Sequence, residues 1–179
     1  MKKFLALLLI FVLACSVATS FAEETTASES KFETVLLKKG SLLLKEWIDC
    51  CQVRPSRSPF SMTFQRARVI DIETGEKFYA LRLEYVYSNS SAIGVMDADE
   101  IDGAIATLEY IKNHIYELKD YSEVIYTASS GVEVGGYHTD ALNEVFIKLN
   151  SNDIFRFDMQ SIDELINAFK GVRVTFALR

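Results

Sequence analysis

The sequence predicts an α+β fold in which antiparallel sheet packs with two amphipathic helices, as a candidate duplicated unit of four strands and one helix. Short runs with apolar residues at every second position alternate with turn residues, which is typical of antiparallel strands. The apolar spacing changes to three and four residues after position 97 and again after position 161, which is typical of helices. The 179 residues are 49% hydrophobic and 25% charged, a composition that favours one globular domain.

Residues 1–22 are predicted to be a cleaved signal peptide. Two lysines precede an apolar run, and small residues follow it up to Ala22, which predicts cleavage that leaves Glu23 as the new N-terminus. The apolar run is shorter than the roughly 20 residues that span a bilayer, so we expect no transmembrane span in the mature chain. The sequence therefore predicts a secreted or periplasmic protein.

Cys15 provides an alternative to free secretion. The residues that precede it, Val-Leu-Ala, resemble a bacterial lipobox, in which the cysteine becomes the lipidated N-terminus. Lipidation there would make the protein a lipoprotein anchored at the cell surface. The better-formed cleavage site at Ala22 favours free secretion over this anchor.

The charge of the mature chain argues against two classes of partner. Removal of residues 1–22 takes away two lysines and no acidic residue, so the formal net charge moves from −6 to −8. Such a chain lacks the basic groove that binding to a phosphate backbone requires. We therefore expect neither nucleic acid nor anionic lipid as the main partner.

The mature chain is predicted to be one domain with a short leader. Residues 23–31 are polar and acidic without periodicity, which predicts a flexible lead-in. Residues 32–179 are predicted to form a single α+β domain, and the repeated order of elements divides it into candidate halves at 32–116 and 121–179.

The first half is predicted to contain strands followed by a helix. The predicted strands cover residues 34–39, 42–53, 62–73, 77–87 and 92–96. One apolar stripe predicts the helix, and its members are Ile101, Ile105, Leu108, Ile111 and Ile115. Asp97 and Glu100 have the spacing of a capping box, in which the aspartate accepts from a helix amide and the glutamate reaches back.

The second half repeats this order. The predicted strands cover residues 123–128, 132–137, 144–149 and 154–157. Ser161 and Glu164 form a second capping-box pattern at the start of a second helix. Residues 172–179 alternate as a strand would and also extend the helical stripe, and we favour the helix.

The starts of the two predicted helices resemble each other. The identical pairs are Asp99 and Asp163, Glu100 and Glu164, and Ala104 and Ala168. Both a duplication and the independent use of one capping pattern explain this match. The order of elements resembles that of the whirly and PC4-like single-stranded-DNA-binding folds, which repeat a four-strand-plus-helix unit. The resemblance covers topology without any sequence motif, so it implies antiparallel sheets with two packed helices and nothing about function.

The acidic stretch before the first helix has two interpretations. It begins like a calcium-binding EF-hand loop at Asp97, but Ile101, Asp102 and Leu108 stand where that loop requires an acid or amide, a glycine and a glutamate. Helix capping therefore explains the stretch better. A weak surface cation site among Asp97, Asp99 and Asp102 is the alternative.

Two local pairs of residues are also candidates. Cys50 and Cys51 are adjacent on a predicted strand, so their thiols are expected on opposite faces, and a strained vicinal disulfide is the alternative. Gly135 and Gly136, next to Tyr137, predict a strand kink or bulge where the backbone could approach a ligand.

The sequence favours non-catalytic binding over catalysis. Tyrosines on the predicted strands form a candidate ligand or partner face, and they are Tyr79, Tyr85, Tyr87, Tyr126 and Tyr137. No pattern of nucleophile and base, metal ligands or phosphate loop is present, so no catalytic residue, metal or cofactor is predicted. The expected partner is an extracellular or envelope protein or a glycan. The alternatives are a secreted hydrolase with dispersed acidic residues and the lipoprotein anchored through Cys15.

Overall fold

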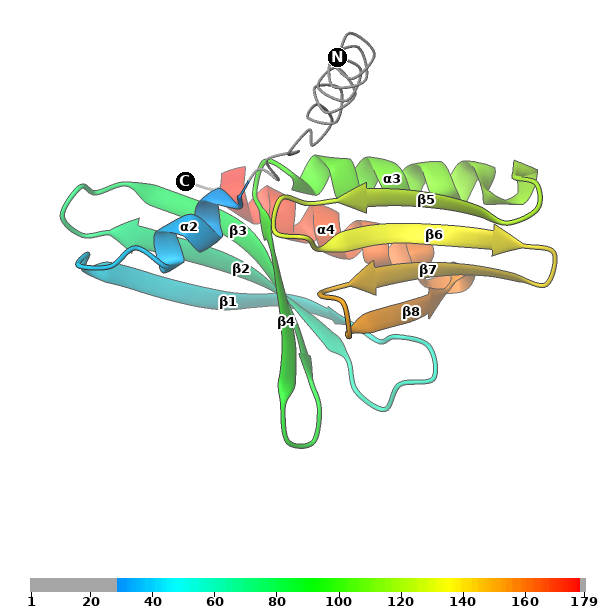
Figure 1. Cartoon of the computed structure of the whole chain (residues 1–179), viewed down its shortest axis with the longest axis horizontal. Helices are drawn as coiled ribbons and strands as arrows, with labels where there is room; N and C mark the ends of the chain where they lie inside the picture. The colour runs from blue at the N-terminus through cyan, green and yellow to red at the C-terminus, as the bar shows by residue number, and fades with distance from the viewer. Residues whose placement is uncertain (1–28, 178–179) are drawn as a thin grey trace, which may run out of the picture.

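The computed structural model describes residues 29–177 as two four-stranded antiparallel sheets and three helices (Figure 1), which confirms the predicted α+β class. The first sheet consists of β1 (Leu43–Val53), β2 (Met62–Asp71), β3 (Lys77–Val86) and β4 (Ser91–Asp97), in that order. The second consists of β5 (Ser122–Thr127), β6 (Glu133–Thr139), β7 (Leu142–Lys148) and β8 (Ile154–Asp158). The helices are α2 (Lys31–Leu36), α3 (Ile101–His114) and α4 (Ile162–Ala177), with single 3-10 turns at Ile115–Glu117 and Met159–Ser161. The predicted signal peptide, including Cys15, Ala22 and Glu23, lies outside the described residues.

Each long helix packs on the sheet of the other half. Helix α3 follows the first sheet in the chain but packs on β5 and β6 of the second, whereas α4 follows the second sheet and packs on β1 and β2 of the first. Gly136 on β6 allows the close approach of α3, because a Cβ atom there would lie only 3.1 Å from the side chain of Ile111. The two helices also contact each other, and α4 passes behind the two sheets in the view of Figure 1.

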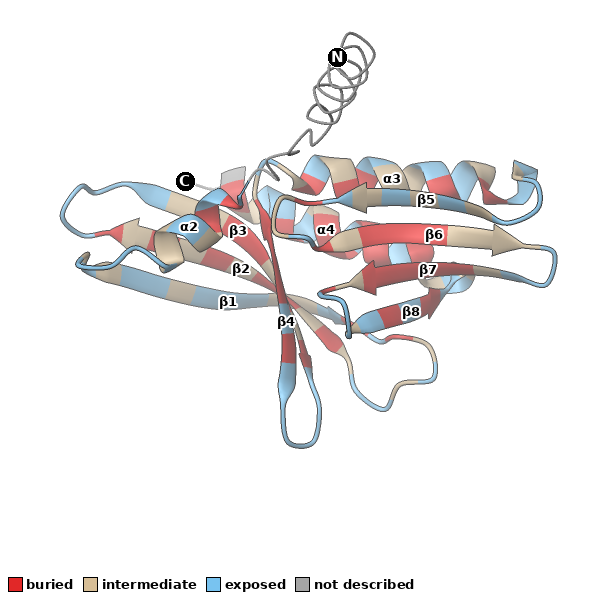
Figure 2. Ribbon diagram, viewed as in Figure 1, coloured by how far each residue is buried: buried red, intermediate tan, exposed pale blue. Residues whose placement is uncertain are grey.

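The main hydrophobic core extends through both halves (Figure 2). The ring of Phe64 on β2 lies edge-on to the ring of Phe169 on α4, with centroids 5.3 Å apart. Gly94 on β4 lies against Val132 and Leu149 of the second half, and a Cβ atom at that position would be 2.8 Å from either side chain. The candidate halves 32–116 and 121–179 therefore share one core instead of forming separate domains.

One predicted strand is wrong. Residues 34–39 were expected to be extended, but the chain forms helix α2 from Lys31 to Leu36. The Ser30 side chain caps this helix by accepting from the amide of Glu33 at 3.2 Å. Phe32 is buried against a small cluster on the outer face of the first sheet, the face opposite α4. This burial and the cap outweigh the strand preference of the sequence at 34–39.

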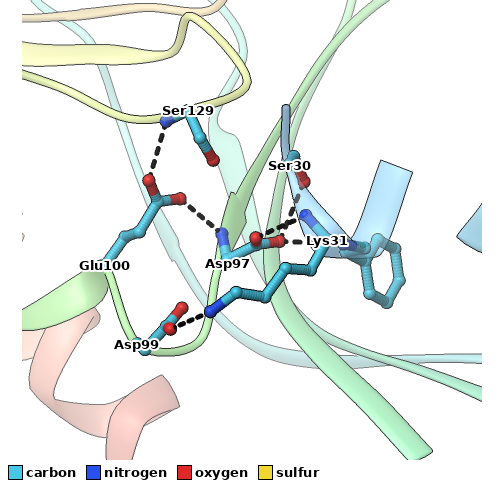
Figure 3. Close-up of polar contacts among 7 residues, drawn as sticks. Ser30, Lys31, Asp97, Asp99, Glu100 and Ser129 are labelled. Carbon is cyan, nitrogen blue, oxygen red and sulfur yellow. Dashed lines mark hydrogen bonds and ion pairs between the residues drawn. The ribbon is translucent and has the colours of Figure 1, made fainter. Parts of the chain in front are cut away.

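The cap of α2 is completed by Asp97, which lies far along the chain (Figure 3). The Asp97 carboxylate accepts from the Ser30 hydroxyl at 2.8 Å and from the amides of Lys31 at 2.7 Å and Phe32 at 3.1 Å. Ser30 and Lys31, the last two described residues assigned to the lead-in, are thereby tied to the end of β4. The prediction that Asp97 caps α3 is wrong, because its carboxylate is already engaged by α2.

Glu100 reaches back as the capping-box pattern predicts. Its carboxylate accepts from the amide of Asp97 at 3.0 Å. The second oxygen accepts from the amide of Ser129 at 2.7 Å, in the loop between β5 and β6. Glu100 therefore links the start of α3 to the second half, in addition to closing its own turn.

Local irregularities lie elsewhere than predicted. Pairing of β6 with both neighbours continues without a shift through Gly135 and Gly136, so the predicted bulge is absent there. The bulge lies instead in β1, where Asp49 and Cys51 face consecutive residues of β2 and Cys50 is the extra residue.

The two cysteines are free thiols, and both line the groove between β1 and α4 instead of lying on opposite faces. The C-terminal segment continues as helix to Ala177, as favoured above.

Candidate ligand-binding surface

The outer face of the second sheet, opposite α3, carries a hollow. One face of this sheet packs on α3 and on the rest of the main core, through buried residues such as Val134, Val145 and Phe157. The opposite face encloses a hollow of about 370 Å³, which we call the sheet hollow. Its lining residues are Tyr121, Glu123, Ile125, Glu133, Tyr137, Phe146, Lys148, Ile154 and Arg156. A volume of this size lies within the range of small-ligand sites, about 300–1,000 Å³.

Strand register organises this surface into rows that run across the sheet. In the central row, Ile125, Gly135 and Phe146 are neighbours on adjacent strands, and Arg156 ends the row on β8. The row is apolar along three of its four positions. On one side of it lies the pair formed by Glu133 and Lys148, and on the other lies the row that contains Tyr137. An apolar row flanked by polar rows results.

Gly135 makes room for the ring of Phe146, which lines the hollow. A Cβ atom at this position would lie 2.6 Å from the carbonyl oxygen of Val124 and 2.9 Å from the ring of Phe146. The Phe146 ring therefore lies beside the bare backbone of β6, and with only 8% of its surface exposed it forms part of the floor. Any larger residue at position 135 would displace that ring.

The polar side chains of the hollow are paired with one another. Lys148 Nζ lies 2.7 Å from Glu133 Oε1, and Arg156 Nε lies 3.4 Å from Glu144 Oε2. The Tyr137 hydroxyl donates to the same Glu144 carboxylate, which is buried beside the hollow. These pairs hold hydrogen-bonding groups in place at the hollow, so a ligand would not have to order them.

Two phenols at the hollow stay protonated well beyond neutral pH. Burial, followed by the hydrogen bond to Glu144, raises the pKa of Tyr137. The hydrogen bond to Glu123, followed by burial, raises the pKa of Tyr121. Both groups therefore serve as neutral hydroxyl donors and aromatic surfaces instead of phenolates.

Only one of the five candidate tyrosines lies in the hollow. Tyr137 lines it, whereas Tyr79 points toward α4, with its ring 5.9 Å from that of Phe176. Tyr126 packs against Gly103 on α3, where a Cβ atom would lie 2.3 Å from the ring. Three of the predicted residues are thus separated by the fold.

The remaining two tyrosines meet at the junction of the sheets. The rings of Tyr85 and Tyr87 are 4.8 Å apart, and Tyr85 lies 4.4 Å from the ring of Phe155 on β8. Tyr85 is almost completely buried, while the Tyr87 hydroxyl donates to Asp153 at 2.8 Å. This aromatic cluster joins β3 to the second half. The five tyrosines consequently do not share one face.

The three carboxylates of the candidate cation site are each paired with a different partner, and Figure 3 shows this for Asp97 and Asp99. Asp97 is engaged by α2, Asp99 forms an ion pair with Lys31 at 2.5 Å, and Asp102 pairs with Arg173 on α4 at 2.5 Å. Within residues 29–177, no group of three or more histidine, cysteine, aspartate or glutamate side chains is arranged to hold a metal ion. The acidic stretch acts as a structural junction.

Comparisons with known proteins found no similar protein: no family model, no curated protein and no solved structure matches this chain. Over the described part of the chain, no helix is long and apolar enough to cross a bilayer. Sequence reasoning identified Tyr137 and Gly135 but missed Phe146 and Arg156. The signal for these was the strict alternation along each strand, which assigns them to one face only once the hairpin registers are known.

Proposed function

We propose that this protein is an exported, non-catalytic binding module that holds a neutral glycan chain in the sheet hollow. The observation that carries the proposal is the apolar row of Ile125, Gly135 and Phe146 between two rows of paired polar groups. A sugar ring presents an apolar C–H face and a rim of hydroxyls, so it matches an aromatic floor with hydrogen-bonding groups at its sides.

The charge balance of the hollow supports a neutral ligand. Two acidic residues line it, Glu123 and Glu133, and two basic residues, Lys148 and Arg156. A phosphate backbone would need an excess of positive charge, which the hollow lacks. Single-stranded DNA is therefore expected to bind far more weakly than an uncharged oligosaccharide.

Calorimetric titration tests the proposal. The probes are cellohexaose, chitohexaose and mannohexaose, with a single-stranded oligonucleotide as the anionic comparison. At least one hexaose is expected to bind, and Tyr121→Ala or Tyr137→Ala is expected to weaken that binding about ten-fold through loss of ring contact. Tyr116→Ala is the matched control, because Tyr116 is 71% exposed and Tyr121 is 67% exposed but only Tyr121 lines the hollow.

Three results contradict the proposal in different ways. If none of the hexaoses binds, the ligand class is wrong. If binding survives both hollow variants, the location is wrong. If new reducing ends accumulate during incubation, the protein is a hydrolase with its acidic residues at this surface, and the non-catalytic part of the proposal is wrong.

Export is tested separately at the N-terminus. Mass spectrometry of the protein recovered from its native host is expected to find Glu23 as the first residue. An acylated Cys15 would instead establish the lipid-anchored alternative, and an intact first residue Met1 would remove the export proposal altogether.

A further inference from the structure

The outer edge of the first sheet is a long strand that pairs on one side only within residues 29–177. β1 is the first strand in the sheet order and has 11 residues. Three of its large apolar side chains are substantially exposed: Leu44 at 43%, Trp47 at 42% and Ile48 at 46%. A strand in this position directs unpaired amide and carbonyl groups away from the sheet, which is a template for pairing with another strand.

The other sheet edges are contacted by loops or are short. The edge at β8 is capped by the loop before β2, because the amide of Ser56 donates to the carbonyl of Arg156 at 2.8 Å and the amide of Asp158 donates to the Ser56 hydroxyl at 2.7 Å. At β4 the Ser130 hydroxyl donates to the carbonyl of Val95. β5 has only six residues. Among residues 29–177, no segment outside the first sheet donates to or accepts from the backbone of β1.

A groove lies beside this open edge. It separates β1 from α4 and has a volume of about 460 Å³. Cys50 and Cys51 line it on the strand side, and Ala168 and Gly171 line it on the helix side. A Cβ atom at Gly171 would have nothing within 4 Å, so the helix side of the groove has room for another side chain.

We propose that a second copy of this chain binds along β1, antiparallel to it and related by a two-fold axis at Trp47, to form a continuous eight-stranded sheet. The bulge at Cys50 ends the regular part of the strand, so the pairing is confined to residues 45–49 and centred on Trp47. In this register Lys45 of each copy stands opposite Asp49 of the other. Opposite charges in cross-strand positions stabilise the pairing.

The faces of the strand are consistent with this register. Lys45, Trp47 and Asp49 share the outer face, because every second residue of a strand points to the same side. Leu44 lies on the α4 side, and the register places Leu44 of the second copy opposite Cys50, at the mouth of the groove. Each exposed leucine therefore enters the apolar groove of the other copy, and the contact repeats by symmetry.

The spacing of the helices fits the same arrangement. α4 lies over β1 and β2, so α4 of the second copy would lie about two strand spacings away, or about 10 Å. Packed helices are separated by about 8–10 Å. The exposed Gly171 lies on this side of α4, where it lines the groove. A two-fold contact of this type is closed, so it yields a dimer instead of a fibre.

Charge reversal tests the register directly. Sedimentation velocity under reducing conditions is expected to show a dimer for the purified protein. Lys45→Asp and Asp49→Lys are each expected to weaken dimerisation about ten-fold, because each places like charges opposite one another. An equimolar mixture of the two variants is expected to dimerise again, since every charged position then faces its opposite.

A second pair of variants avoids the hydrogen bond that Asp49 accepts from Gln65 at 2.7 Å. Leu44→Asp is expected to abolish the dimer, whereas Leu142→Asp, at a position that is 42% exposed on β7, is expected to leave it intact. A protein that remains monomeric at all concentrations overturns the proposal. So does a dimer that survives Leu44→Asp, or a mixture of the charge variants that dimerises no better than either variant alone.

Discussion

The two sheets have the same number of strands in the same order, yet they are covered in different ways. The first sheet has α4 on one face and α2, with the buried Phe32, over part of the other, which leaves its long edge at β1 open. The second sheet has α3 on one face and the sheet hollow on its outer face. The open surface is therefore an edge in one half and a face in the other.

This difference shows that a repeated order of elements does not produce two equivalent units. Each long helix covers the sheet of the other half, so neither half buries its own core. Two residues illustrate the difference: Asp97 ties α2 to the first sheet, and Gly135 makes room for the Phe146 ring on the outer face of the second. The following predictions alter one half and leave the other as the reference.

The largest effect is expected from Asp97→Ala, which removes three hydrogen bonds to the start of α2 and leaves the buried Ser30 hydroxyl without its acceptor. The free energy of unfolding is expected to fall by about 3 kcal/mol. Asp102→Ala is the control, because Asp102 is exposed and paired on the surface, and it is expected to cost below about 0.5 kcal/mol. Equal losses for the two variants, measured by urea unfolding, would show that the Asp97 hydrogen bonds to α2 do not stabilise the fold.

The next largest loss of stability is expected from a change at the contact between α3 and the second sheet. In Gly103→Ala the new methyl group would meet the ring of Tyr126 at 2.3 Å, so the ring or the helix must move. Overpacking of this type is expected to lower the free energy of unfolding by about 2 kcal/mol. Urea unfolding measures it, and the double variant with Tyr126→Ala is the control, since removal of the ring should eliminate most of the added cost. An unchanged stability in Gly103→Ala would disprove the close contact.

Replacement of a glycine by alanine in α4 is expected to raise the free energy of unfolding instead of lowering it. Gly171 lies in the helix with no atom within 4 Å of a Cβ position, so alanine fits without strain. Gly171→Ala is expected to stabilise the protein by about 0.5–1 kcal/mol, because glycine is the poorer helix former. A destabilised variant in thermal unfolding at low protein concentration would show that this side of α4 is already covered.

The smallest effect is a difference in pH dependence between the halves. The ion pair with Lys38, followed by the amides of Thr74 and Glu73, lowers the pKa of Asp71 from its ordinary 3.8. The folded state therefore favours the carboxylate, and its contribution is complete above about pH 4 and lost as the pH falls through the lowered pKa. Asp71→Asn is expected to make the acid-induced loss of stability shallower.

In the second sheet, the expected change of stability with pH lies in the alkaline range. The raised pKa of Tyr137 favours the phenol in the folded state, so its contribution is complete up to about pH 10 and lost as the pH rises further. Tyr137→Phe is expected to flatten the alkaline limb and leave the acid limb unchanged. Urea unfolding measured across pH checks both variants. If stability depends on pH in the same way in both, the assignment of the acid range to Asp71 and of the alkaline range to Tyr137 is wrong.

The sequence was sufficient for most elements because their signals are local. Alternation predicts the eight strands, and the three- and four-residue spacing predicts α3 and α4, since these periods follow from the geometry of each element alone. The stretch at 34–39 was mispredicted because its helix depends on Asp97, which lies about sixty residues away. The bulge at Cys50 was likewise missed, because it depends on pairing with β2.

By itself the sequence determined the α+β class, the order of strands and helices, and the candidate residues Tyr137 and Gly135. Only the tertiary structure decided which sheet each helix covers, that the five tyrosines lie apart, and that Phe146 and Arg156 join Tyr137 on one face. The physical reason is the range of the interactions. Periodicity records which side of an element is apolar, whereas the partner of that side depends on packing and register between residues that are distant in the chain.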